Sequence, residues 1–118
     1  KTTTSWRSFH NEAGNDTGLS YADTDLSQGT GAQVLSASNS VGADTDQACC
    51  GHLTIYNAAS TTHVKHFQAE TQFSHLSDYA VRDFVGGYAN TTSALTNIKF
   101  EFASGNIDAG KILMFGIN

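Results

Sequence analysis

The feature that most constrains the fold is the alternation of apolar and polar residues in the second half of the chain. In "NIKFEFA" every second residue is apolar, at Ile98, Phe100 and Phe102. In "HLTIYN" the apolar residues Leu53 and Ile55 are also two apart. A repeat of two places these side chains on one face of a β-strand. The second half is therefore predicted to consist of strands with one buried face.

Five such strands are expected, at residues 49–57, 62–74, 79–88, 95–103 and 110–118. The stretches "NAAS", "YANTTSA" and "SGNIDAG" between them are rich in residues that tolerate tight turns. No stretch keeps the 3.6-residue spacing of a helix. The pattern predicts an all-β fold, an antiparallel β-sandwich that is jelly-roll-like.

A chain of 118 residues is expected to form a single domain. Residues 1–46 are loop-rich and polar, with short strands predicted at 5–10 and 33–36, and the strand around Trp6 is expected at a sheet edge. Residues 47–118 are expected to supply the core strands. Because the first residue is Lys1 rather than Met, processing, an omitted segment and excision from a longer chain all stay open.

The charge of the chain limits its partners. Charged residues make up 14% of the sequence, the net charge is -5, and the few basic residues are scattered. Nucleic-acid binding needs clustered Lys and Arg, so no nucleic-acid partner is expected. The longest apolar runs are too short for membrane insertion.

A neutral surface rich in hydroxyl and amide groups favours packing against other proteins. The chain has no proline, which removes one usual protection of sheet edges, so a neighbouring subunit or the loops of the first half are expected to cover them.

The histidines and cysteines give weak signals for chemistry. His63 and His66 are three apart, which directs them to opposite faces of a strand and away from a shared metal ion. Cys49 and Cys50 are adjacent, and a disulfide between neighbours is strained, so both are predicted to be free thiols with one packed inward. A nucleophilic cysteine beside His52 would lack a third group to orient it.

The acidic pairs are equally uninformative. Asp23 with Asp25, and Asp44 with Asp46, fall in polar loops without the spacing of a calcium-binding loop, and solvated acids are the favoured interpretation. We therefore expect no catalytic residue, no metal site, no cofactor and no enzymatic activity.

Aromatic residues are the strongest candidates for a binding role. Aromatic rings can stack on sugar rings, and the Asn, Gln and Asp residues around them can hydrogen-bond to sugar hydroxyls. The same residue types also pack at protein interfaces. The candidate glycan or interface contacts are Trp6, Tyr21, Tyr56, Tyr79 and Tyr88.

Two runs of the sequence point to a family. The run "GHLTIYNAASTTHVKHFQAET", followed by "VGGYANTTSALTNIKFEFASGNIDAGKILMFGIN", resembles a family of tailed-bacteriophage virion structural proteins of the marine and cyanophage type. Members of that family carry a closing strand of the form S-G-N-I-x-x-G-x-I-x-L-[YF]-G-I. The resemblance implies a β-sandwich on the exterior of the phage particle, and it implies no catalytic residues.

The functional hypothesis is accordingly a non-enzymatic virion structural protein. It would be a capsid decoration (cement) protein or a domain of a tail fibre or spike. It would act through protein–protein assembly with other capsid or tail proteins. We expect it to form a homo-oligomer, specifically a trimer. The alternative is a carbohydrate-binding module that attaches to host surface glycans.

Overall fold

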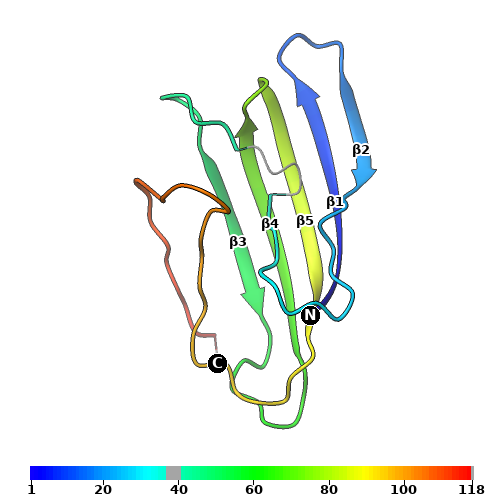
Figure 1. Cartoon of the computed structure of the whole chain (residues 1–118), viewed down its shortest axis with the longest axis vertical. Helices are drawn as coiled ribbons and strands as arrows, with labels where there is room; N and C mark the ends of the chain where they lie inside the picture. Colours follow the sequence, from blue (N-terminus) through cyan, green and yellow to red (C-terminus); the bar gives the residue numbers. More distant parts are fainter. Residues whose placement is uncertain (37–40, 118) are drawn as a thin grey trace.

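The computed structural model describes residues 1–36 and 41–117, and it contains one antiparallel sheet (Figure 1). The sheet has five strands in the order β2-β1-β5-β4-β3. Their bounds are β1 (Thr2–Asn11), β2 (Thr17–Tyr21), β3 (Cys49–Ile55), β4 (Lys65–His75) and β5 (Tyr79–Ala89). The sheet is open, with β2 and β3 as its two edges. No helix in the described part of the chain is long and apolar enough to cross a membrane.

One face of the sheet, here called the inner face, carries the core. The register places Phe73 opposite Val81 and Ala69 opposite Val85, so these side chains share a face. The buried apolar residues of the described chain are these four and Ala22. Alternation along β4 and β5 thus produces the buried face that the sequence pattern predicts for these strands.

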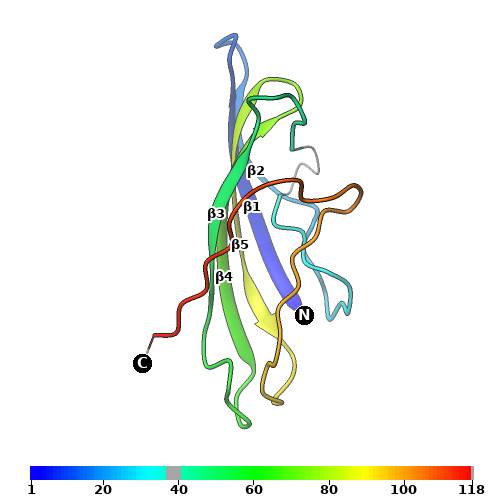
Figure 2. The same cartoon turned by 90° about the vertical axis from the view of Figure 1, so that its left-hand side faces the viewer.

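The polar first half of the chain covers the inner face. Residues 22–36 lie on this side of the sheet, whereas the opposite side, here called the outer face, is bare over most of its area (Figure 2). The Thr3 amide donates to the Leu26 carbonyl at 2.9 Å, and the Ser5 hydroxyl donates to the Ala22 carbonyl at 3.3 Å. The Thr71 hydroxyl donates to the Leu35 carbonyl. Backbone and hydroxyl hydrogen bonds therefore attach a loop that has few apolar side chains of its own.

Most of the predicted strands are confirmed. The all-β class is confirmed, and so are the strands predicted near 5–10, 49–57, 62–74 and 79–88. Residues 33–36 do not form a strand. β1 is not an edge strand, because β2, which the sequence analysis did not predict, pairs with it from Trp6 to His10.

The two strands predicted last in the chain are wrong. Residues 95–103 and 110–117 do not form strands, and residue 118 of the second prediction lies outside the described residues. The described part of the chain consequently contains no second sheet with which to form a sandwich. The physical reason is that neither stretch finds a paired strand. The Leu95 amide donates to the Ala58 carbonyl of the β3–β4 connection at 2.9 Å, and beyond Leu95 the described backbone makes no hydrogen bond to the sheet.

Residues 95–117 are called the C-terminal segment below. It begins near the β3–β4 connection, ascends on the inner side of the sheet, turns, and then descends past the β3 edge toward the outer side (Figures 1 and 2). Gly105 and Gly110, with φ of 78° and 140°, lie in and just after the turn. These conformations favour glycine, which explains the two glycines of "SGNIDAG".

Candidate interaction surfaces

A row of side chains crosses all five strands on the outer face. The register places Tyr21 beside Trp6, Trp6 beside Phe84, Phe84 beside Glu70, and Glu70 beside His52. The Trp6 and Phe84 rings are stacked, with centroids 4.0 Å apart and planes 14° apart. Such stacked cross-strand aromatics hold both rings in fixed positions.

Charged groups continue this row toward β4. Arg82 forms an ion pair with Glu70, and its guanidinium lies over the Phe84 ring at 5.1 Å from the centroid. Both interactions orient the arginine along the sheet surface. The outer face therefore presents a rigid aromatic surface with a carboxylate and a guanidinium at its border.

A shallow hollow of about 340 Å³ lies beside Trp6 on the outer face, and we call it the outer hollow. The side chain of Trp6 is 42% exposed there. The hollow is lined by Thr4, Trp6, His52, Gln68, Ala69, Glu70, Phe84, Val85 and Gly86. Amide, carboxylate, imidazole and hydroxyl groups next to an exposed indole can bind the hydroxyl groups and the apolar face of a sugar ring.

The structure brings four of the five predicted aromatic residues to the outer face. Trp6 and Tyr21 lie in the row, Tyr88 contacts His66, and the Tyr56 hydroxyl donates to Gln68 Oε1 at 3.1 Å. Tyr79 does not belong with them. It pairs with Asn11 and His75, on the register positions of the inner face.

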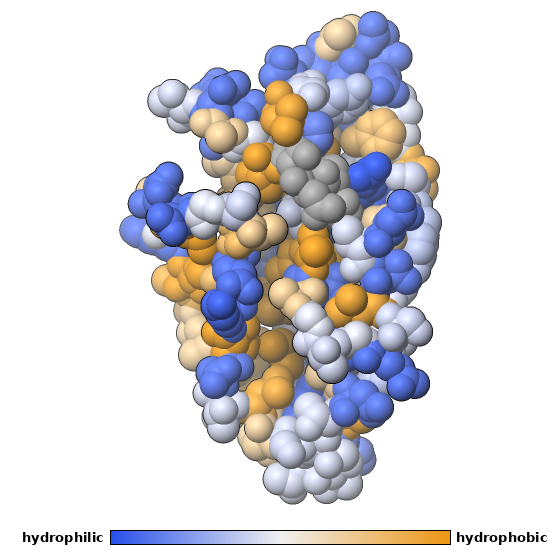
Figure 3. Space-filling view, viewed as in Figure 1, coloured by the Kyte–Doolittle hydropathy of each residue, from blue (hydrophilic) through white to orange (hydrophobic). Residues whose placement is uncertain are grey.

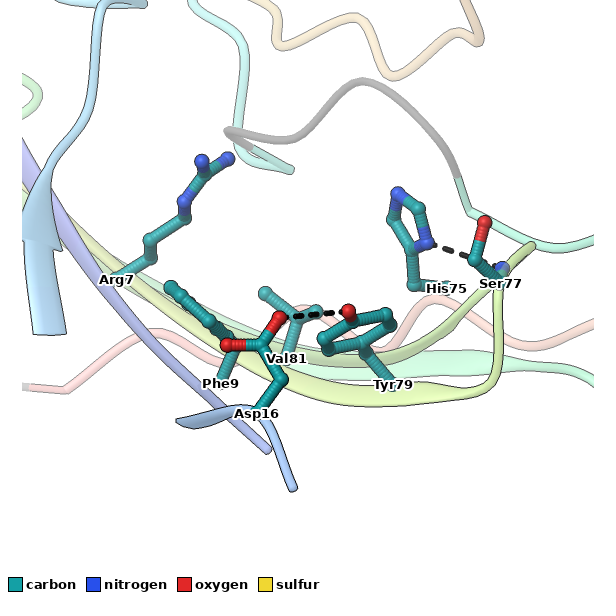
Figure 4. Close-up of a pocket in the computed structure, with 7 residues that line it drawn as sticks. All are labelled: Arg7, Phe9, Asp16, His75, Ser77, Tyr79 and Val81. Atoms are coloured by element: carbon teal, nitrogen blue, oxygen red, sulfur yellow. Dashed lines mark hydrogen bonds between the residues drawn. The ribbon is translucent and has the colours of Figure 1, made fainter. Parts of the chain in front are cut away.

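Tyr79 lines a second hollow, the inner hollow, of about 370 Å³ (Figure 4). Its other lining residues are Arg7, Phe9, Asp16, His75, Ser77 and Val81. The Tyr79 hydroxyl donates to Asp16 Oδ2 at 2.7 Å. This hydrogen bond to the carboxylate, with partial desolvation and the negative charge of Asp16, raises the pKa of Tyr79 above its ordinary value of 10.0. The Asp16 carboxylate therefore favours the protonated form of the phenol.

The inner hollow does not show the arrangement of a nucleophile and its base. His75 Nδ1 accepts a hydrogen bond from the Ser77 backbone amide at 3.1 Å, rather than from the Ser77 hydroxyl. Asp16 is bound to a phenol and not to the imidazole (Figure 4). These contacts stabilise the connections at this end of the sheet, where Asp16 precedes β2 and Ser77 precedes β5.

The cysteine prediction is partly wrong. Cys49 and Cys50 are free thiols, but both are exposed, so neither is packed inward. They begin β3, which is an edge strand, and this position leaves them without a covering layer. Among residues 1–36 and 41–117, no group of three or more His, Cys, Asp or Glu side chains is placed to hold a metal ion.

The C-terminal segment is a second surface, which is apolar. It holds nine of the fourteen large hydrophobic residues that are exposed in the described chain. Ile98, Phe100 and Phe102, predicted to point inward, are 40–46% exposed, so that prediction is wrong. Figure 3, which views the inner face, shows hydrophobic side chains along this segment and in the recess between it and the covering loops.

The total surface of the chain is too large for a compact monomer. It is 8444 Å², whereas a folded monomer of 12.5 kDa exposes about 6,200 Å². The radius of gyration is 15.4 Å, against about 13.5 Å for a compact chain of this length. The excess of about 2,300 Å² exceeds the roughly 800 Å² that each partner buries in a standard interface and reaches the range of obligate assemblies.

Comparisons with known proteins do not assign the chain to a family. No family model matches the chain, and no curated protein or solved structure is similar enough to count as a match. The chemistry and geometry of the outer face and of the C-terminal segment therefore carry the functional argument.

Proposed function

We propose that the chain is a non-enzymatic structural subunit of a bacteriophage particle that functions by assembling with other protein subunits. It would lie on the exterior of the virion, as a capsid decoration protein or as a domain of a tail fibre or spike. The exposed apolar C-terminal segment is the observation that carries this proposal. The sequence resemblance of the same segment to the closing strand of phage virion proteins supports the choice of particle.

The energetics favour assembly over an isolated monomer. Each large apolar side chain gains about 1.5–3 kcal/mol when it is moved from water into a packed environment. Leu113, Met114 and Phe115 are each more than 70% exposed, and they are consecutive. A soluble monomer rarely exposes so continuous an apolar stretch, and such stretches mark contacts with other proteins.

Assembly would also supply the missing layer of the predicted fold. The described chain has one sheet whose inner face is covered mainly by loops. In the proposed assembly, the C-terminal segments of neighbouring copies take up strand pairing, and the jelly-roll-like sandwich is complete only in the oligomer. A trimer is the proposed state, as a closed ring in which a neighbour covers each segment.

Sedimentation velocity of the purified full chain over a range of concentrations tests the proposal. The expected result is a homo-oligomer, a trimer, that dissociates only on strong dilution. A chain that sediments as a monomer at every concentration, and that does not bind phage particles, would overturn the assembly role.

A second candidate function, glycan binding, is favoured by the outer hollow. An exposed Trp6 held by Phe84, next to Gln68 and Glu70, offers one stacking surface and several hydrogen-bonding groups. Its position on the open face leaves it accessible even when the inner face is covered. We propose attachment to host surface glycans as the function of this face if the subunit forms part of a fibre.

Replacing Trp6 by Ala is expected to weaken glycan binding at least about tenfold, because it removes the exposed indole on which a sugar ring would stack. Binding is measured on a glycan array and then by calorimetry with the best ligand. The matched control is Tyr79→Phe, which alters an aromatic residue of the inner face and should leave binding unchanged. Equal binding by the Trp6→Ala variant, or no glycan bound by the unsubstituted chain, would exclude this candidate.

A further inference from the structure

We infer that residues 112–117 of one copy add as a strand to the free β3 edge of a second copy, antiparallel to β3. The inference rests on the proposed assembly function and names both its partner and its contact. The donor is the last part of the C-terminal segment, and the acceptor is the outer edge of β3.

The donor is a short run of apolar residues with no charge. Residues 112–117 read "ILMFGI", and the four large side chains at 112–115 and the one at 117 are exposed. Apolar residues occupy both alternating sets, which is typical of a strand covered on both faces. The run forms no strand within its own chain.

The acceptor is an edge without the usual protection against pairing. β3 (Cys49–Ile55) pairs with β4 on one side, and no described strand lies on its other side. Its sequence "CCGHLTI" contains no charged residue and no proline, the two features that commonly block strand addition. Its seven residues are enough to pair with all six residues of the donor run, whereas β2, the other edge, has five. Strand addition to such an edge is a recurrent mode of protein recognition.

A second copy can pair the donor run with β3 in the antiparallel direction, whereas the chain's own β3 edge cannot. In its own copy the donor run descends past β3 in the same direction as β3 itself (Figure 1), so pairing there would be parallel. Every pairing in this sheet is antiparallel. A second copy is free to present the run in the opposite direction. Because each copy carries one donor and one acceptor, copies of this chain cover both, whereas a different protein would cover one and leave the other exposed.

The exposed thiols of β3 provide a test of partner and direction. In an antiparallel pair the carboxyl end of the donor lies beside Cys49 and Cys50, and in a parallel pair its amino end does. We would prepare the full chain as Ile117→Cys and as Ile112→Cys, oxidise both mildly, and separate the products on a non-reducing gel. Peptide mapping then identifies which cysteines are joined. Leu76→Cys, an exposed residue of the β4–β5 turn, controls for random oxidation, and the unsubstituted chain controls for links between β3 strands.

The expected result is an interchain disulfide from the thiol introduced at 117 to Cys49 or Cys50, at least about tenfold more abundant than in the Leu76→Cys control. A link within one chain would overturn the inference in favour of pairing with the chain's own β3. An interchain preference for the thiol introduced at 112 would overturn the antiparallel direction that the inference requires. The absence of any specific link would also overturn it. Sedimentation of the same samples distinguishes failure of this inference from failure of the proposed assembly function. Oligomers without the link contradict only the inference, and monomers contradict the proposed function as well.

Discussion

Replacing Phe73 by Ala is expected to remove most of the stability of the fold. Phe73 is 2% exposed and lies on the inner face, opposite Val81 of β5 and Cys49 of β3. Truncating a buried Phe to Ala costs about 3–5 kcal/mol, and the total stability of a small domain is about 5–15 kcal/mol. Because the described chain buries few apolar side chains, its stability should lie near the lower end of that range. Urea unfolding followed by circular dichroism measures the loss.

The matched control for this experiment is Leu76→Ala. Leu76 is 59% exposed in the β4–β5 turn, so its truncation should change the free energy of unfolding by less than about 0.5 kcal/mol. If Phe73→Ala costs no more than this control, the inner face is not the core, and the assignment of the two faces of the sheet is wrong.

Replacing Phe115 by Asp is expected to dissociate the oligomer while the subunit stays folded. Phe115 is 79% exposed in the single chain, so a carboxylate there costs the isolated subunit little. In the assembly the same position would be buried. The lost apolar burial alone is worth about 1.5–3 kcal/mol, which is roughly a tenfold to hundredfold weaker association, and an unpaired buried carboxylate adds to this loss. Sedimentation velocity gives the change in association, and far-ultraviolet circular dichroism checks the fold.

Leu76→Asp is the control for Phe115→Asp, because it places the same charge at an exposed leucine outside the C-terminal segment. It should sediment as the unsubstituted chain does. An oligomer that survives Phe115→Asp unchanged would show that residues 112–117 are not part of the contact between copies.

The strands of the sheet could be predicted because their pattern and their environment agree. In β4 and β5 each alternate residue meets a buried neighbour in the same chain, so the period of two is sufficient to identify the strand and its inner face. β2 was missed because "TGLSY" is short, contains a glycine and is stabilised by its pairing with β1 rather than by burial. Residues 33–36 are apolar at Val34 and Leu35, but they serve as a loop cover for the inner face.

The C-terminal segment shows the limit of such patterns. Ile98, Phe100 and Phe102 alternate as regularly as the residues of β4, yet they are not buried in their own chain. Alternation indicates that a stretch needs an apolar surface on one side, but it does not indicate which chain provides that surface. This is the physical reason for the incorrect prediction of two closing strands.

The outer face could be predicted only in part for a related reason. Residue type identified Trp6, Tyr21, Tyr56 and Tyr88, since large aromatic residues among amides are informative in sequence. Phe84, Gln68 and Glu70 were missed, because their place beside Trp6 depends on which strands are neighbours. The pairing of β1 with β5, which are separated by three other strands in sequence, brings Phe84 to Trp6. A signal was present in the alternation of Arg82, Phe84 and Tyr88, which assigns these three residues to one face of a strand.

Amide hydrogen exchange of the full chain at low and at high protein concentration tests most directly the central claim that the C-terminal segment pairs between copies. The amides of residues 112–117 should exchange freely in the dilute monomer and become protected at concentrations where the chain is oligomeric. The amides on the free edge of β3 should become protected over the same range. Protection that is the same at all concentrations would show that the segment closes its own sheet, and exchange that stays free in the oligomer would show that other surfaces hold the copies together.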